Sequence, residues 1–454
     1  MIRRVAVIDI GKTNAKVALV DLDGMAETAL RRTANTVAMD GPYPHHDVER
    51  LWAFILDSLA DLHREQPIDA ISITTHGATA VLVDASGRLA LPVIDYEFSG
   101  IDELTQAYDA ARPPFAETGT PRLPAGLNIG AQLFFQQKRF PVEFSHTAAI
   151  LMYPQYWALR LTGVAANEVT SLGCHTDLWN PWRADYSSLV DSMGWRGLMA
   201  PVRPAKDRLG PILPAIAQRT GLAPRTPVFC GLHDSNASLL PHLLSDSPPF
   251  CVVSTGTWVV SMAVGGRKVD LDPARDTLVN VNGLGDPVPS ARFMGGREFS
   301  QLADSLPANW SEKDVAAVLS RKSLLLPSMQ QGSGPFPHST ARWVDAEGLG
   351  PGQRFAVISF YLALMTATCL DLIGGDGPTT VEGPFARNPL FIRMLAAATG
   401  RPAIASETST GTSIGAALLA FDGVKATSKG ERTEPPPERA WGEYARAWRQ
   451  AIET

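Results

Sequence analysis

The 454-residue sequence lacks the features that mark several large classes of protein. It has four cysteines, with no Cys-x-x-Cys pair and no histidine at zinc-finger spacing: Cys174, Cys230, Cys251 and Cys369. This scarcity argues against a disulfide framework and against a zinc finger. We expect the cysteines to be small buried thiols in a reducing cytoplasm.

Excess positive charge and long apolar runs are also missing. The formal net charge is −6, which gives no electrostatic footprint for nucleic acid or an anionic membrane. No uninterrupted apolar stretch has the length of a membrane-spanning helix, and the N-terminus lacks the apolar region of a secretory signal. A phosphorylated ligand is still possible, because backbone amides bind phosphate without net positive charge. We expect a cytoplasmic protein with neither nucleic-acid nor membrane partners.

Length and composition describe an ordinary globular chain of more than one domain. Hydrophobic residues make up 45% and charged residues 19%, and 454 residues exceed a typical single core. The polar, proline-bearing stretch from Ser245 to Pro249 is a candidate crossing point. The sequence therefore predicts an N-terminal domain over 1–244 and a C-terminal domain over 245–454.

The first motif is a predicted hairpin with a polar tip. Residues 5–10 read as a buried strand, Gly11-Lys12-Thr13-Asn14 as a turn, and 15–21 as a second strand. Asp9 interrupts the apolar strand, and a buried carboxylate needs a cation, a metal or a donor. Thr13, Asn14 and the amides of Gly11 and Lys12 could donate to phosphate, with Asp9 holding Mg²⁺ through water. The alternative is an ordinary turn, since no Gly-x-x-x-x-Gly-Lys-[Ser/Thr] loop is present.

The same layout returns at the start of the second half. Residues 251–262 read as strand, Ser254-Thr255-Gly256-Thr257 tip and strand. Its hydroxyls and a free glycine amide suit a phosphate. Two such hairpins, one opening each half of the chain, indicate two related domains closing over a nucleotide.

Residues 231–238, Gly-Leu-His-Asp-Ser-Asn-Ala-Ser, follow a short buried strand. Ligand sites collect at the carboxyl ends of strands in open α/β sheets. Asp234 is therefore a candidate general base. The competing interpretation is that Asp234 only caps the helix that follows.

Other polar groups beside strand ends have the residue types that a sugar needs. His76 and Gly77 follow the predicted strand 70–75, and Asp95, Tyr96 and Glu97 follow another short apolar run. Each of these side chains could instead simply lie at the surface in contact with water. Two adjacent histidines, at 45–46, precede a predicted helix capped by Asp47 and are interpreted as a solvated helix entry rather than a metal site.

Residues 355–372 are apolar nearly all round and predict a buried central helix. A strand over 379–382 leads into a loop, Gly383-Pro384-Phe385-Ala386-Arg387, and Asn388-Pro389 begins a helix that ends at Gly400. A glycine loop before a helix suits a purine and its ribose. Residues 411–420 predict a small-residue helix for close packing.

These motifs together resemble the FGGY carbohydrate kinases of the actin/Hsp70/sugar-kinase superfamily. The resemblance runs nearly end to end, and its motif style is similar to rhamnulokinases, fuculokinases and xylulokinases. It implies an α/β fold of two actin-like (ribonuclease H-like) domains with an interdomain cleft, the first carrying sugar site and base and the second the nucleotide. It also implies ATP and Mg²⁺ as cofactor and metal, and leaves a homodimer possible.

The resemblance implies ATP-dependent phosphorylation of a sugar hydroxyl, most simply on a ketose or deoxyketose of rhamnulose, fuculose, xylulose or ribulose type. Asp234 would be the base, and Asp9 with Asp234 would hold the metal through water. The implied sugar-binding residues are His76, Gly77, Asp95, His233 and Asp234. The implied nucleotide-binding residues are Gly11, Thr13, Asn14, Thr255, Gly256, Thr257, Gly383, Pro384 and Asn388.

Two departures from the family pattern bear on specificity. Pro384 stands where the adenosine motif usually has a further glycine, and it removes an amide donor. The turn at Asp95 lacks the tryptophan or arginine that the family commonly has near this acid. A catalytically silent sugar or nucleotide sensor, and a phosphatase of the same superfamily, are the rival functions.

Overall fold

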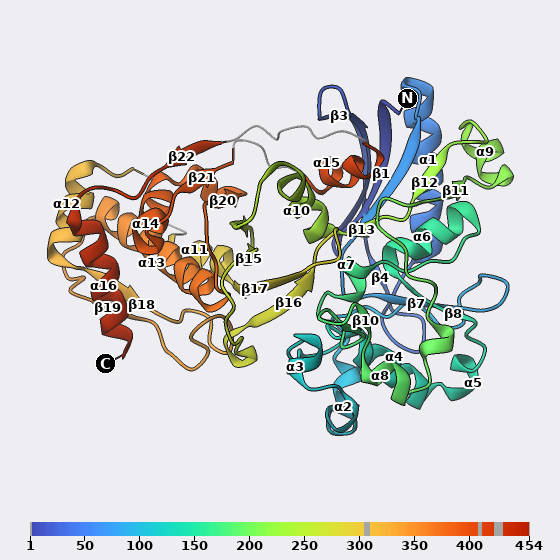
Figure 1. The fold of residues 1–454 in the computed structure, drawn as a ribbon, viewed down its shortest axis with the longest axis horizontal. Coiled ribbons are helices and arrows are strands. Elements are labelled where there is room, and N and C mark those ends of the chain that lie inside the picture. The colour runs from blue at the N-terminus through green and yellow to red at the C-terminus, as the bar shows by residue number, and fades with distance from the viewer. Residues whose placement is uncertain (1, 304–308, 407–410, 422–429, 454) are drawn as a thin grey trace. The chain divides into compact units, whose positions relative to one another are not determined.

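A computed structural model describes residues 2–303, 309–406, 411–421 and 430–453 (Figure 1). The chain forms two compact units, and it first passes from one to the other between Ser245 and Asp246. Unit 1 holds the N-terminal residues to Ser245 and two later segments, Val279–Pro287 and Thr410–Lys425. Unit 2 holds Asp246–Leu278, Val288–Ser409 and Ala426–Thr454. Each unit is a mixed α/β structure built on its own mixed sheet.

The sheet of unit 1 is built around the first predicted hairpin. β1 (Arg4–Ile10) pairs antiparallel with β2 (Asn14–Asp21) and parallel with β6 (Ala70–Thr75), which makes it a central strand. The strand order is β11-β12-β6-β1-β2-β3, and β13 (Leu232–His233) also pairs with β6. The remaining members are β3 (Ala26–Ala34), β11 (Arg208–Pro211) and β12 (Pro227–Phe229). Every residue of β6 is buried, as expected for a parallel strand covered on both faces.

Short strand pairs and helices surround this sheet in unit 1. The pairs are β4 (Val37–Ala38) with β5 (His45–His46), β7 (Ala80–Val83) with β8 (Ala149–Met152), and β9 (Trp179–Asn180) with β10 (Asp185–Tyr186). The helices are α1 (Val48–Glu65), α2 (Thr105–Ala111), α3 (Phe115–Thr118), α4 (Ile129–Arg139), α5 (Pro141–Phe144), α6 (Tyr153–Thr162), α7 (Val169–Leu172), α8 (Ser188–Ser192), α9 (Pro214–Thr220), α10 (Asp234–Ser245) and α15 (Thr412–Ala417). Asp47 caps α1 by accepting the amide of Arg50, as predicted.

Unit 2 repeats the strand pattern of unit 1. β14 (Phe250–Thr255) pairs antiparallel with β15 (Val259–Val264) and parallel with β20 (Thr379–Glu382). The path β17-β15-β14-β20-β21-β22 has the same sequence of parallel and antiparallel neighbours as β3-β2-β1-β6-β12-β11. The other strands of the path are β17 (Pro287–Phe293), β21 (Ala403–Ala405) and β22 (Glu431–Thr433). The prediction of two related α/β domains is confirmed at the level of fold.

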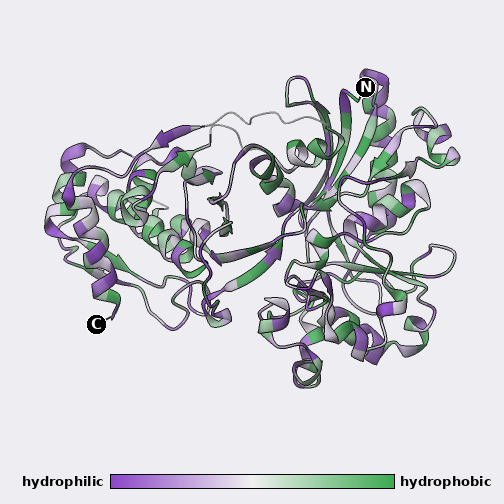
Figure 2. Ribbon diagram, viewed as in Figure 1, coloured by the Kyte–Doolittle hydropathy of each residue, from purple (hydrophilic) through white to green (hydrophobic). Residues whose placement is uncertain are grey.

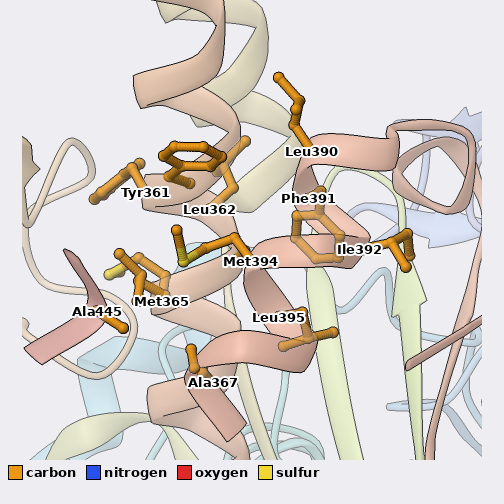
Figure 3. Close-up of a cluster of buried hydrophobic side chains, with 14 of the residues drawn as sticks. Tyr361, Leu362, Met365, Ala367, Leu390, Phe391, Ile392, Met394, Leu395 and Ala445 are labelled. Carbon is orange, nitrogen blue, oxygen red and sulfur yellow. The ribbon is translucent and has the colours of Figure 1, made fainter. Parts of the chain in front are cut away.

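The core of unit 2 forms around α13 (Pro351–Leu372), which is green over most of its length in Figure 2. By length and composition α13 could span a membrane, but 83% of its apolar window is buried in the protein. Figure 3 shows side chains from α13, α14 (Pro389–Thr399) and α16 (Arg439–Glu453) packed together. Burying such apolar side chains stabilises the fold by about 1.5–3 kcal/mol each. The sequence prediction of a buried helix is confirmed, and its apolar run is interrupted by polar residues such as Ser359 and Thr366.

The rest of unit 2 consists of short elements on that core. They are α11 (Gly295–Ala303), α12 (Glu312–Arg321), β18 (Leu324–Leu326) and β19 (Arg342–Val344). β16 (Thr277–Val281) lies where the chain passes from unit 2 to unit 1. All four cysteines lie in the described part of the chain and are buried thiols outside any disulfide bond, as expected of small apolar side chains.

Candidate active site

Asp9, near the end of β1, has both partners that a buried carboxylate requires. Its residue is 6% exposed, and Lys16 Nζ, directly across the hairpin, lies 3.3 Å from Oδ2. The hydroxyl of Thr412, at the start of α15, donates to the same oxygen. Burial raises the pKa of Asp9, Lys16 and Thr412 lower it, and the nearby charge of Asp234 raises it again. Asp9 and Asp234 are therefore electrostatic neighbours inside unit 1.

Asp234 is the first residue of α10 and directly follows β13. Its Oδ1 accepts the amide of Ser235 at 2.7 Å, and its side chain is 29% exposed. Burial raises the pKa of this carboxyl, and the charge of His76 opposes that rise. The bond to the Ser235 amide joins adjacent residues and is not the contact of a helix cap with its N2 or N3 amide, and the carboxylate is open to a reactant. A raised pKa brings a general base closer to neutral pH, where proton transfer is most efficient.

The imidazole ring of His233 lies against the carboxylate of Asp234. Its Nε2 lies 3.1 Å from Asp234 Oδ1, and burial lowers the pKa of the imidazole to about 4, so the ring is neutral at pH 7. A Cβ on Gly77 would lie 2.8 Å from His233 Nε2, so this ring needs glycine at position 77. The Sγ of Cys174 lies 3.8 Å from the same nitrogen. Gly77 and His233, which the family resemblance assigns to the sugar, therefore lie side by side in unit 1.

Glu168 and Thr170 hold the backbone of His233 in place through a chain of hydrogen bonds. The amide of His233 donates to Thr170 Oγ1 at 2.9 Å. The same hydroxyl and the Thr170 amide, at 3.0 Å, both donate to Glu168 Oε2. Glu168 is fully buried, and burial raises its pKa to about 7. No local sequence pattern indicates this role for Glu168 and Thr170, because it depends on a contact with His233, 63 positions after Thr170.

His76 lies among aromatic rings. Its Nδ1 is 2.8 Å from the carbonyl of Gly77, and its ring centroid lies 5.2 Å from His46, 5.2 Å from Tyr153 and 5.4 Å from Tyr96. Burial lowers the pKa of both His76 and His46, so both rings are neutral at pH 7. His46 is 1% exposed. The interpretation of this histidine as part of a solvated helix entry is wrong, because β4–β5 pairing and the Val93 carbonyl, 2.9 Å from its amide, fold it inward.

Asp95 is buried and already has a cationic partner. Lys12, from the tip of the first hairpin, makes an ion pair with Asp95 Oδ1 and lies 3.3 Å from Glu97. Its Nζ also lies 4.9 Å from the centre of the Tyr96 ring. The cation and the aromatic ring beside this acid are therefore Lys12 and Tyr96. The sequence pattern predicts a role only for the backbone amide of Lys12, because Asp95 lies 83 positions away.

The backbone amides of the glycines at the two hairpin tips are hydrogen-bonded, contrary to the expectation. The amide of Gly11 donates to the Asn14 carbonyl at 2.9 Å, and the amide of Gly256 donates to the Trp258 carbonyl at 3.0 Å. Each amide closes its own turn, so the prediction of free glycine amides is wrong. The Thr13 hydroxyl accepts from the Asn14 side chain at 3.1 Å, and both residues are exposed at the first tip.

In unit 2, Thr255 ties the second hairpin to the predicted adenosine loop. Its hydroxyl donates to the Glu382 carbonyl and accepts the Phe385 amide at 3.1 Å. With 6% exposure, Thr255 supports the loop, whereas Gly256 and Thr257 are exposed at the tip. Gly383 has φ 83° and Pro384 begins a 3₁₀ turn over Pro384–Arg387.

Asn388 holds the other end of this loop. Its side-chain oxygen caps α14 by accepting the amides of Leu390 and Phe391, and its Nδ2 donates to Ser359 at 2.9 Å. The prediction of an Asn388 cap is confirmed. The amide of Arg297 in α11 donates to the Thr257 carbonyl at 3.4 Å, which places the start of that helix at the second tip. The Gly295-Gly296 pair at the start of α11 is the sequence signal for this close packing.

Asp9 and Asp234 suit a magnesium ion that keeps most of its water. Both are carboxylates, the preferred ligands of Mg²⁺, and their mutual repulsion is the kind that a cation relieves. Within the described ranges no group of three or more His, Cys, Asp and Glu side chains could hold a metal by itself. The donor set therefore fits a hydrated ion rather than a protein cage.

Comparison with known families identifies the chain. The N-terminal domain of the FGGY family of carbohydrate kinases matches residues 5–241, and the carbohydrate kinase FGGY C-terminal domain matches residues 247–429. The chain belongs to the FGGY family of carbohydrate kinases. The family resemblance drawn from the motifs is thereby confirmed.

Solved structures and curated relatives agree with this assignment. A carbohydrate kinase from Novosphingobium aromaticivorans is 37% identical, with a TM-score of 0.92 over 98% of this chain and 100% of that one. Xylulose kinase from Lactobacillus acidophilus has the same fold, with a TM-score of 0.81 over 99% of this chain and 98% of that one at 15% identity. The probable L-xylulose kinase of Pasteurella multocida is 28% identical over 57% of this chain and 55% of that protein. L-fuculokinase of Salmonella typhi is 23% identical over 58% of this chain and 57% of that protein, so the similarity spans about half of each curated relative.

Proposed function

We propose that this FGGY kinase transfers the γ-phosphoryl group of ATP to a hydroxyl of a ketose or deoxyketose of xylulose, fuculose, rhamnulose or ribulose type. The observation that carries the proposal is Asp234, a partly exposed carboxylate with a burial-raised pKa at a strand end, beside Asp9. The names of the relatives, L-xylulose kinase and L-fuculokinase, support the sugar class.

Asp234 accepts the proton of the sugar hydroxyl as that oxygen attacks phosphorus. Phosphoryl transfer depends mostly on positioning and charge stabilisation, and Mg²⁺ held by Asp9 and Asp234 through water would supply part of the latter. His76, His233 and Asp95, with Gly77 making room, orient the sugar. Neutral histidines suit this task, because an uncharged imidazole can both donate to and accept from a hydroxyl.

The nucleotide is assigned to the two hairpin tips and the adenosine loop. Thr13, Asn14, Gly256 and Thr257 would face phosphates, while Thr255 and Asn388 hold the loop that begins at Gly383 and Pro384. Pro384 offers no amide, so we expect the base to be bound by packing more than by hydrogen bonds to this residue. A cytoplasmic location and a possible homodimer belong to the same proposal.

The test is an ADP-release assay with Mg²⁺, ATP and a panel of D- and L-xylulose, D- and L-ribulose, L-fuculose and L-rhamnulose. Sugar-dependent ADP release and a phosphate monoester visible by ³¹P NMR are expected for at least one sugar. Binding of sugar and ATP without product would instead support the silent sensor. Release of inorganic phosphate without sugar would support the phosphatase, and either outcome would overturn the kinase.

A further inference from the structure

Lys12 joins two segments of unit 1 that lie 83 residues apart in sequence. Its backbone is at the tip of the β1–β2 hairpin, and its Nζ makes the ion pair with Asp95 in the turn that follows Ile94. The side chains of Lys12 and Asp95 are 17% and 8% exposed, whereas Glu97 is 67% exposed. A pair this well shielded from solvent is screened much less by salt than a surface pair.

Both ends of this link are braced. At the tip, Asn35 donates from Nδ2 to the Gly11 carbonyl at 2.8 Å and from its amide to the Thr13 carbonyl at 2.9 Å. At the turn, the Asp95 amide donates to the Pro44 carbonyl at 3.0 Å. A displacement of the hairpin tip is therefore expected to move the turn at Asp95 through Lys12, and a displacement of the turn to move the tip.

The contacts of Asp95 leave room for a second partner. Lys12 and the amide of Glu97, at 3.2 Å, both bond to Oδ1. In the contacts described for this turn, Oδ2 is the oxygen left for a sugar hydroxyl. One carboxylate can thus hold the hairpin tip and the sugar at the same time.

We propose that Lys12 couples the two substrates: phosphate binding at the first tip and sugar binding at Asp95 strengthen each other through the Lys12–Asp95 pair. This rests on the proposed kinase function. A phosphate at Thr13 and Asn14 restrains the tip, which fixes Nζ and with it the carboxylate that the sugar meets. Such coupling is reciprocal, so sugar tightens nucleotide binding by the same factor.

The test measures the turn without needing the sugar's identity. Hydrogen exchange of peptides covering 94–98 is followed with and without the non-hydrolysable analogue AMPPNP and Mg²⁺, in wild type, Lys12→Met and the matched control Lys206→Met, an exposed lysine of unit 1. We expect AMPPNP to slow exchange in the turn by at least about fivefold in wild type and control, the lower range of known couplings. In Lys12→Met the slowing should fall below about twofold at saturating AMPPNP.

Calorimetry of AMPPNP binding separates the possible failures. No AMPPNP binding to wild type would overturn the kinase proposal and this one together. Binding with equal protection in Lys12→Met would overturn only the coupling. Should Lys12→Met unfold, Asp95→Asn must lose protection and Lys12→Arg, which keeps the cation, must retain it. The reverse result would contradict the inference.

Discussion

The hydroxyl of Thr412 donates to the carboxylate of Asp9, 403 positions earlier in the chain. Both residues belong to unit 1, because the chain returns to it after most of unit 2 has been formed. The bond stabilises the ionised form of a carboxyl group whose pKa burial raises. Thr412 therefore helps to keep Asp9 charged, as the proposed magnesium site requires.

Replacing Thr412 by valine should make activity more sensitive to acid. Losing a hydrogen bond to a charged group, worth about 1.5 kcal/mol, raises the pKa of Asp9 further. Because Asp9 acts as an anion, the acidic limb of the pH profile of kcat/KM moves to higher pH. The loss of activity relative to wild type is therefore larger at pH 6 than at pH 8. A full pH profile measures the shift, with Thr412→Ser as the control that keeps the hydroxyl. An equal loss at every pH would contradict this role.

Gly415 sets the distance between α15 and α10. A Cβ at this position would lie 1.7 Å from the Ala237 carbonyl oxygen, so Gly415→Ala must push the two helices apart. We expect a loss of about 1–3 kcal/mol of unfolding free energy, the usual cost of overpacking. Activity should fall as well, because α15 also carries Thr412. Gly197→Ala, with no atom within 4 Å of the added Cβ, is the matched control and should be neutral or slightly stabilising.

Glu168 makes stability depend on pH in a defined direction. Burial raises its pKa to about 7 in the folded protein, so the folded state holds more protons than the unfolded state below that value. Stability from this group is therefore lost as pH rises from about 4.5 to about 7, by at most about 3 kcal/mol. Glu168→Gln imitates the protonated form and should flatten this decline in chemical denaturation at pH 5 and pH 8.

Glu298 provides the equivalent experiment in unit 2. It is 1% exposed, accepts the Tyr361 hydroxyl at 2.9 Å, and burial raises its pKa to about 7. Glu298→Gln should flatten the pH dependence of unit 2 in the same way. The exposed Glu443→Gln should leave the profile unchanged. Glutamine variants with the wild-type slope would show that these carboxyls ionise normally.

Local patterns predicted most of the elements and the positions of Asp9 and Asp234 at strand ends. The two hairpins, the buried α13 and the capped helix at Asn388 depend on short-range periodicity and capping, which the sequence displays. Asp9 was predicted to need a cation or donor, and Lys16 supplies the cation because hairpin register places it opposite.

The missed residues depend on contacts between distant segments. His46 reads as a polar residue at a helix entry, and only the pairing of β4 with β5 shows that it is buried. The Lys12 side chain points to a turn 83 positions later, and Thr412 reaches Asp9 across 403. The free glycine amides were wrongly predicted because a tight turn uses its own amide for closure.

The most direct test of the account is the sugar-dependent turnover of Asp234→Asn. Wild type and this variant are compared in ADP release with the best sugar of the panel, with sugar and AMPPNP affinities measured by calorimetry. Asp61→Asn, on the surface of α1, is the matched control. The account predicts that Asp234→Asn loses about 10²- to 10⁴-fold in kcat, the contribution of a general base, while both affinities stay close to wild type. Turnover near the wild-type rate in Asp234→Asn would contradict it.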